Sequence, residues 1–106
     1  MMAFVMSSVI LLAAVQSAGT NNARDAFRNC IKEAAAQAKT NKVGADAFEG
    51  FAKTHCTAQQ ASFIAAMWAF DSKNKVSKKQ SADDAGLQIE DILVSASEKY
   101  AFEIKQ

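Results

Sequence analysis

The absence of proline is the feature that most constrains the fold of this 106-residue chain, and glycine occurs only four times. All-β folds usually need both residues at their turns, whereas helices need neither. The length suits one domain, and half of the residues are apolar, as in ordinary globular proteins. The sequence therefore predicts an all-α fold: a small bundle of three to four helices forming a single domain over residues 21–106.

Apolar residues recur at helical spacing in four segments. The predicted helices are 21–39, 45–55, 57 to about 70, and a last one from about Lys78 or Ser81 to Ile104. Asn21 or Asn22 would cap the first helix. Thr57 and Gln60 have the spacing of a capping box at the start of the third.

The third predicted helix differs from the others because its body, residues 61–70, is apolar nearly all round. Such a helix is usually buried centrally. The larger apolar residues expected in the core are Phe27, Ile31, Phe48, Phe51, Phe63, Ile64, Met67, Trp68, Phe70, Ile89, Ile92 and Leu93. On the last helix, the expected buried face is Ala82, Ala85, Ile89, Ile92 or Leu93, Ala96 and Tyr100. This is a small core, and small cores usually need a cross-link or a partner.

Two cysteines, Cys30 and Cys56, follow residue 20, and two cysteines allow one connectivity. In a short exported chain they predict a disulfide. Two buried free thiols in a cytosolic protein are the alternative. A redox-active role is disfavoured because no CxxC motif is present to lower a thiol pKa.

The first 20 residues contain no charged side chain, and the stretch 1–15 is apolar apart from two serines. Small residues follow, and cleavage is plausible after Ser17 or Ala18. This pattern is typical of a secretory signal peptide, although the usual positive charge near the start is missing. We therefore expect residues 1–18 to be removed and the protein to be periplasmic or secreted. An uncleaved membrane anchor and a buried N-terminal helix are the alternatives, the apolar run being shorter than the roughly 20 residues that span a bilayer.

Catalytic and metal-binding patterns are weak. His55 directly precedes Cys56, but a Cys–His nucleophile pair would need a free thiol and an imidazole turned toward it. One histidine and two cysteines without repeated spacing fall short of a metal site. We therefore expect no enzymatic activity, no catalytic residue, no metal and no cofactor.

Charged residues form two groups. Lys73, Lys75, Lys78 and Lys79 are the densest cluster and a possible interaction site for phosphate, lipid headgroups or an acidic partner; a solvated loop is the favoured interpretation. Arg24, Arg28 and Lys32 recur at four-residue steps, as on the solvent-facing side of a helix. The net charge of +1 gives no reason to expect nucleic-acid binding.

Trp68 with Phe63, Met67 and Phe70 could line a ligand pocket between helices, although core packing is favoured. In outline the chain resembles the acid-stress chaperones of the bacterial periplasm, which are short, helical and stapled by one disulfide. No motif carries this resemblance, so no residue role is transferred from it.

The expected function is that of a non-enzymatic binding or interaction module, with an unknown protein or envelope component as partner. Membrane association is expected only if the leader is uncleaved. The alternative is a periplasmic stress chaperone that exposes aromatic surface when its carboxylates are protonated. The sequence predicts neither the partner nor the oligomeric state.

Overall fold

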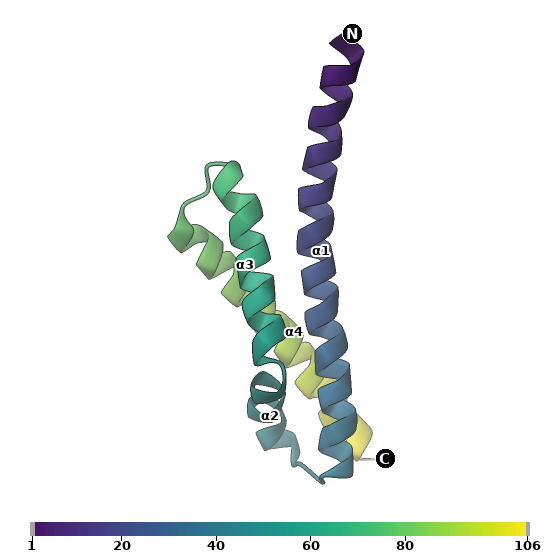
Figure 1. Ribbon diagram of the computed structural model, residues 1–106. Coiled ribbons are helices and arrows are strands. Elements are labelled where there is room, and N and C mark those ends of the chain that lie inside the picture. Colours follow the sequence, from purple (N-terminus) through teal and green to yellow (C-terminus); the bar gives the residue numbers. More distant parts are fainter. Residues whose placement is uncertain (1, 106) are drawn as a thin grey trace.

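The computed structural model describes the backbone of residues 2–105 and the side chains of residues 19–105. Within this part the chain forms four α-helices and no strand (Figure 1). They are α1 (Met2–Thr40), α2 (Phe48–His55), α3 (Thr57–Lys73) and α4 (Lys78–Ile104), with a 3₁₀ turn, η1 (Ala45–Ala47), before α2. The predicted all-α bundle is confirmed. The predicted leader, 1–18, lies outside the residues whose side chains are described.

The helices pack as two crossing layers. α1 and α3 lie side by side, and α4 crosses behind them from the α3–α4 turn at one end of the bundle to the α1–α2 connection at the other (Figure 1). α2 is short and contacts α1, α3 and α4 near this second end. The buried core lies where the three long helices meet; it comprises Phe27, Cys30, Ile31, Ala34, Ala38, Phe48, Ala52, Cys56, Phe63, Met67, Ala85, Ile89, Leu93 and Tyr100.

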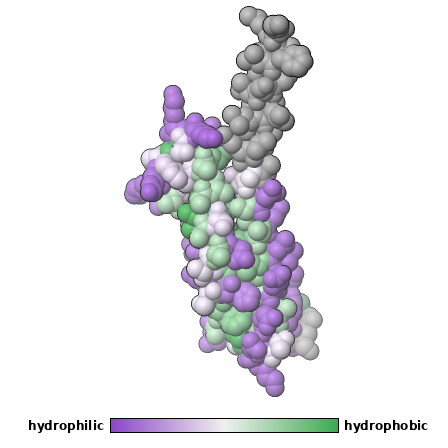
Figure 2. Space-filling model, viewed as in Figure 1, coloured by the Kyte–Doolittle hydropathy of each residue, from purple (hydrophilic) through white to green (hydrophobic). Residues whose placement is uncertain are grey.

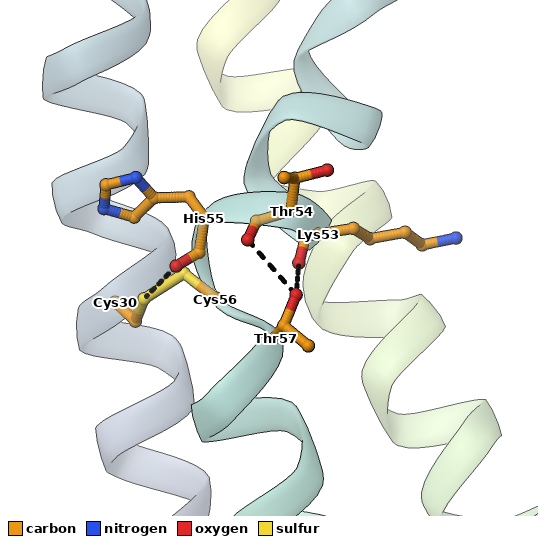
Figure 3. The surroundings of a disulfide bond; sticks show 6 residues. All are labelled: Cys30, Lys53, Thr54, His55, Cys56 and Thr57. Atoms are coloured by element: carbon orange, nitrogen blue, oxygen red, sulfur yellow. Dashed lines mark hydrogen bonds between the residues drawn. A yellow bond between two sulfur atoms is a disulfide. The ribbon is translucent and has the colours of Figure 1, made fainter.

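The Cys30–Cys56 disulfide is confirmed, with the two Cα atoms 5.9 Å apart. It ties the middle of α1 to the one-residue junction between α2 and α3 (Figure 3). Both cysteines are buried in the core, so the cross-link joins α1 to the α2–α3 junction within the apolar packing.

Two predicted helix starts are wrong. Gly19 and Thr20 are already helical, so Asn21 and Asn22 lie within α1 and do not cap it. At α3 the capping box does not form: the Thr57 hydroxyl donates to the carbonyl oxygens of Lys53, at 3.0 Å, and Thr54, at 3.1 Å (Figure 3). The reason is that α2 ends one residue before α3 begins, which brings the unpaired carbonyls of its last turn to this hydroxyl.

The second predicted helix, 45–55, is divided. Ala45–Ala47 form the 3₁₀ turn η1, and the α-helix begins at Phe48. Tightened turns of this kind are common at helix ends. Of the side predicted to face inward, Phe48 and Ala52 are buried, Phe51 is half-buried and His55 is exposed.

The prediction that α3 is buried centrally is also wrong. Only Phe63 and Met67 of α3 are buried, Trp68 and Phe70 are half-buried, and Ile64 is 38% exposed. α3 has α1 on one flank and α4 on another, and α2 contacts it only near its start. Among the residues whose side chains are described, no further helix covers the rest of its circumference, so part of an apolar helix faces solvent.

Candidate functional site: a groove between α3 and α4

Two adjoining hollows lie along α3 and α4, one of about 310 Å³ between these two helices and one of about 370 Å³ that Glu49 and Lys53 of α2 also line. Ile64 and Ala82 line both, so the hollows form one depression. We call it the α3–α4 groove and define it by Ile64, Trp68, Lys78, Ser81, Ala82 and Gly86. Figure 2 shows hydrophilic atoms gathered at the α3–α4 turn and apolar surface continuing along α3 beneath them.

The α3 side of the groove carries large apolar side chains, and the middle of its α4 side carries small residues. Ile64 and Trp68 stand one helical turn apart on α3, as do Ala82 and Gly86 on α4. A Cβ atom added at Gly86 would meet nothing within 4 Å. The depression therefore exists because α4 presents its smallest residues where it passes the exposed apolar side of α3.

The position of Ala82 corrects the predicted buried face of α4. Ser81 is buried at 2% exposure, and Ala82 is exposed in the groove. Ala85, Ile89, Leu93 and Tyr100 are buried as predicted. Spacing alone could not separate positions 81 and 82, which differ by about 100° around the helix.

Ser81 is the polar residue most enclosed at the groove. It lines the first hollow, and its hydroxyl makes no hydrogen bond within residues 19–105. Although Ser81 is enclosed as a residue, its hydroxyl oxygen remains accessible from the hollow. The hydroxyl of Ser81 is therefore available to whatever occupies the groove.

The four lysines of the predicted interaction site are brought together at one end of this groove. Lys73 is in the last turn of α3, Lys75 is in the connection with a φ of 61°, and Lys78 and Lys79 begin α4. Lys79 forms an ion pair with Asp83 at 3.0 Å. Within residues 19–105 the other three have no ion pair, and of the four only Lys78 lines the groove.

His55 and Cys56 do not form a catalytic pair. Cys56 is buried in the disulfide, and His55 is exposed and stacks on Phe51 with ring centroids 6.1 Å apart. The carbonyl oxygen of His55, not its imidazole, faces Cys30 Sγ, at 3.9 Å (Figure 3). Among residues 19–105, no three His, Cys, Asp or Glu side chains converge as a metal site would require.

A second pocket, of about 220 Å³, lies between α1 and α3 and contains two residues whose environment the sequence did not reveal. Arg24, predicted to face solvent, is half-buried; its guanidinium lies 5.4 Å from the centre of the Phe63 ring, and its Nε donates to Gln88 Oε1 at 3.0 Å. Asp71 Oδ2 is buried without a hydrogen-bond partner among the described residues. Both contacts of Arg24 depend on where α3 and α4 cross α1, which spacing within α1 cannot show.

No helix within residues 19–105 is long and apolar enough to cross a bilayer. The chain matches no protein-family model, no curated protein and no solved structure in the comparisons made with them.

Proposed function

We propose that the protein is an exported, non-enzymatic binding module that holds an apolar chain in the α3–α4 groove. One observation carries the proposal: α3 is apolar nearly all round, yet it turns Ile64 and Trp68 toward a groove that no other described element fills. Ligand sites are typically hollows of about 300–1,000 Å³ with apolar walls and a few placed polar groups. The α3–α4 groove has this size; its half beside Trp68 has this composition, and its other half is also lined by Glu49, Lys53, Gln60 and Glu90.

Gly86 supports the proposal because no folding requirement explains it. Its φ is not positive, and no neighbour approaches closely enough to exclude a Cβ atom. In the interior of a helix, glycine is about 0.8–1 kcal/mol less favourable than alanine. What glycine provides at this position is an unfilled groove.

Export rests on two features of the chain. The uncharged apolar run at 1–15 followed by small residues is typical of a signal peptide. Disulfides such as Cys30–Cys56 persist in oxidising compartments and are rare in the cytosol. Mass spectrometry of the protein recovered outside the cytoplasm, with and without reductant, tests both features. An intact N-terminal methionine together with two alkylatable thiols would refute export.

The binding proposal is tested with the neutral hydrophobic dye N-phenyl-1-naphthylamine. Trp68 is the single tryptophan of the chain and lines the groove, so energy transfer from it reports a bound dye, and the comparison of variants locates the dye. We expect the dye to bind the folded protein and to be displaced by Gly86→Leu, which fills the groove. The matched control is Gly50→Leu, since Gly50 is also helical, exposed and without neighbours within 4 Å of a Cβ atom. Equal dye binding by both variants would refute the proposal.

A further inference from the structure

We infer that the ligand of the α3–α4 groove is a single-chain anionic amphiphile, a long-chain carboxylate, with its head group bound by Lys78 and Ser81. The inference rests on the proposed function and adds the chemical class of the ligand. It is carried by the juxtaposition of a cation without an ion pair and a hydroxyl without a hydrogen bond, within residues 19–105, at the end of the groove that Ile64 and Trp68 line.

The head-group site is formed by one turn of α4. Lys78 and Ser81 are three positions apart on α4, so their side chains lie on the same face, and both line the first hollow. The nearby carboxylates are engaged elsewhere: Asp83 pairs with Lys79 at 3.0 Å, and Asp84 accepts from Gln80 Nε2 at 2.9 Å. A ligand carboxylate can therefore accept hydrogen bonds from Lys78 Nζ and from the Ser81 hydroxyl.

The positive charge at this end has two further sources. Lys73 and Lys75 lie at the same turn without ion pairs among residues 19–105. The first turn of α4 also carries the positive end of the helix dipole. At the opposite end of the groove, Glu49 is neutralised by Lys53 at 3.8 Å and Glu90 has no ion pair within the described residues. The groove is thus positive at one end only, which orients an anionic head group toward Lys78.

The tail site is the remainder of the groove, where apolar residues of α3 and α4 are bordered by Glu49, Lys53, Gln60 and Glu90. From Lys78 the groove passes Trp68, Ile64, Ala82 and Gly86 toward Leu93. Lys78 and Leu93 are 15 positions apart on one helix, so the groove is about 22 Å long. Ala82 and Gly86 are the smallest residues of its α4 wall, and they leave room for an unbranched chain beside Ile64.

The polar groups at one end of the groove distinguish this ligand from other occupants. A membrane surface would contact all four lysines of the α3–α4 turn but would not reach the hydroxyl of Ser81. A second copy of the chain would bring exposed apolar residues such as Leu87 and Val94, but no free carboxylate aligned with Lys78. An apolar chain with a terminal anion, by contrast, can fill the groove and bind both the Ser81 hydroxyl and Lys78.

The experiment titrates the protein with dodecanoate and, separately, with dodecanol, following Trp68 emission. We expect dodecanoate to shift the emission and to bind more tightly than dodecanol. Lys78→Glu should weaken dodecanoate binding about tenfold or more, the effect of losing a charge-assisted hydrogen bond, and should weaken dodecanol binding much less, because a neutral hydroxyl has no charge to pair with Lys78. Ser81→Ala should weaken dodecanoate binding about three- to fivefold.

Lys73→Glu is the matched control, because Lys73 shares the lysine-rich turn but does not line the groove. It should weaken dodecanoate binding clearly less than Lys78→Glu does, because Lys73 contributes only a screened charge and no hydrogen bond to the head group. Equal weakening by Lys73→Glu and Lys78→Glu would overturn the inference, as would binding only to anionic phospholipid vesicles. A dimer that Gly86→Leu dissociates in the absence of ligand would also overturn it.

The two proposals fail in different ways. If dodecanol and dodecanoate bind at Trp68 with the same affinity and Lys78→Glu changes neither, the groove binds apolar chains and only the ligand class is refuted. If neither amphiphile shifts Trp68 emission and the neutral dye is insensitive to Gly86→Leu, both proposals are refuted.

Discussion

The rings of Phe48 and Tyr100 stack with their centroids 4.4 Å apart and their planes inclined by 14°. Phe48 begins α2 and Tyr100 lies in the last part of α4, so the stack joins two elements that are distant in sequence. Both rings are buried, and Tyr100 Oη donates a hydrogen bond to the carbonyl oxygen of Val43 at 2.5 Å. This contact closes the end of the bundle opposite the lysine-rich turn.

Tyr100→Phe should remove the hydrogen bond to Val43 and keep the stack. We expect the free energy of unfolding to fall by about 1 kcal/mol, because the carbonyl of Val43 loses a partner in a partly buried place. Tyr100→Ala should cost about 3–5 kcal/mol, because it also leaves a cavity against Phe48. Urea unfolding followed by circular dichroism measures both. A Tyr100→Phe variant as damaged as Tyr100→Ala would show that the ring contributes little.

Replacing both Cys30 and Cys56 by alanine should lower the free energy of unfolding by about 3 kcal/mol. Without the cross-link the unfolded chain regains the conformational entropy that closing the loop had removed. For a domain of this size the melting temperature should fall by roughly 12–24 °C. Reducing the disulfide of the unmodified protein should give the same loss. A melting temperature that is insensitive to reductant would show that the cysteines are not linked.

Gly86→Ala should raise the free energy of unfolding by about 0.5–1 kcal/mol. The added Cβ meets nothing within 4 Å, and alanine restricts the unfolded chain more than glycine does. Gly50→Ala should stabilise by a similar amount, since Gly50 is also in a helix with free space around it. Chemical denaturation of the two variants in parallel checks this. Destabilisation by Gly86→Ala alone would mean that α4 needs glycine there for packing.

Arg24→Ala should destabilise the protein by about 1–2 kcal/mol, because it removes the contact over the Phe63 ring and the hydrogen bond to Gln88. Arg28→Ala is the matched control: Arg28 lies one turn further along α1 and is exposed. Its replacement should change the free energy of unfolding by less than about 0.5 kcal/mol. Equal effects of the two changes would mean that the contacts of Arg24 contribute nothing.

Much of the bundle could be predicted from spacing within single helices. Phe27, Ile31, Ala34 and Ala38 mark the buried side of α1 at steps of three and four, and all are in the core. The disulfide followed from cysteine count and chain length. These features are local or depend on composition, so one sequence suffices to predict them.

The groove could not be predicted because it depends on how helices cross. The composition of α3 predicts central burial, but a four-helix chain with a short α2 provides too few neighbours to surround it. The lysine cluster was visible in the sequence, whereas the alignment of Lys78 with Ser81 and Trp68 requires the angle between α3 and α4. The acid-stress chaperone stays a prediction that neither spacing nor the fold tests.

The pH dependence of stability should include a contribution from Glu103, which joins the ends of α1 and α4. Lys39 Nζ donates a hydrogen bond to Glu103 Oε2, and Lys99 lies 4.0 Å from Oε1. The hydrogen bond from Lys39 and the charges of Lys39 and Lys99 outweigh desolvation and hold the pKa of Glu103 below its ordinary value of 4.5. A carboxyl group whose pKa is lower in the folded state stabilises the fold above its unfolded pKa, and this stabilisation is lost as the pH falls through the folded value.

Glu103→Gln should therefore lower the urea midpoint near neutral pH. The difference in urea midpoint between this variant and the unmodified protein should shrink as the pH falls through the lowered pKa of Glu103. Because the pair is partly exposed, added salt should also narrow the difference. Glu98→Gln is the control, since Glu98 is exposed on the same helix and has no ion pair within residues 19–105. Urea midpoints for the three proteins between about pH 7 and pH 3 make the comparison. Parallel pH profiles for the unmodified protein and Glu103→Gln would show that the contact between Lys39 and Glu103 does not stabilise the fold.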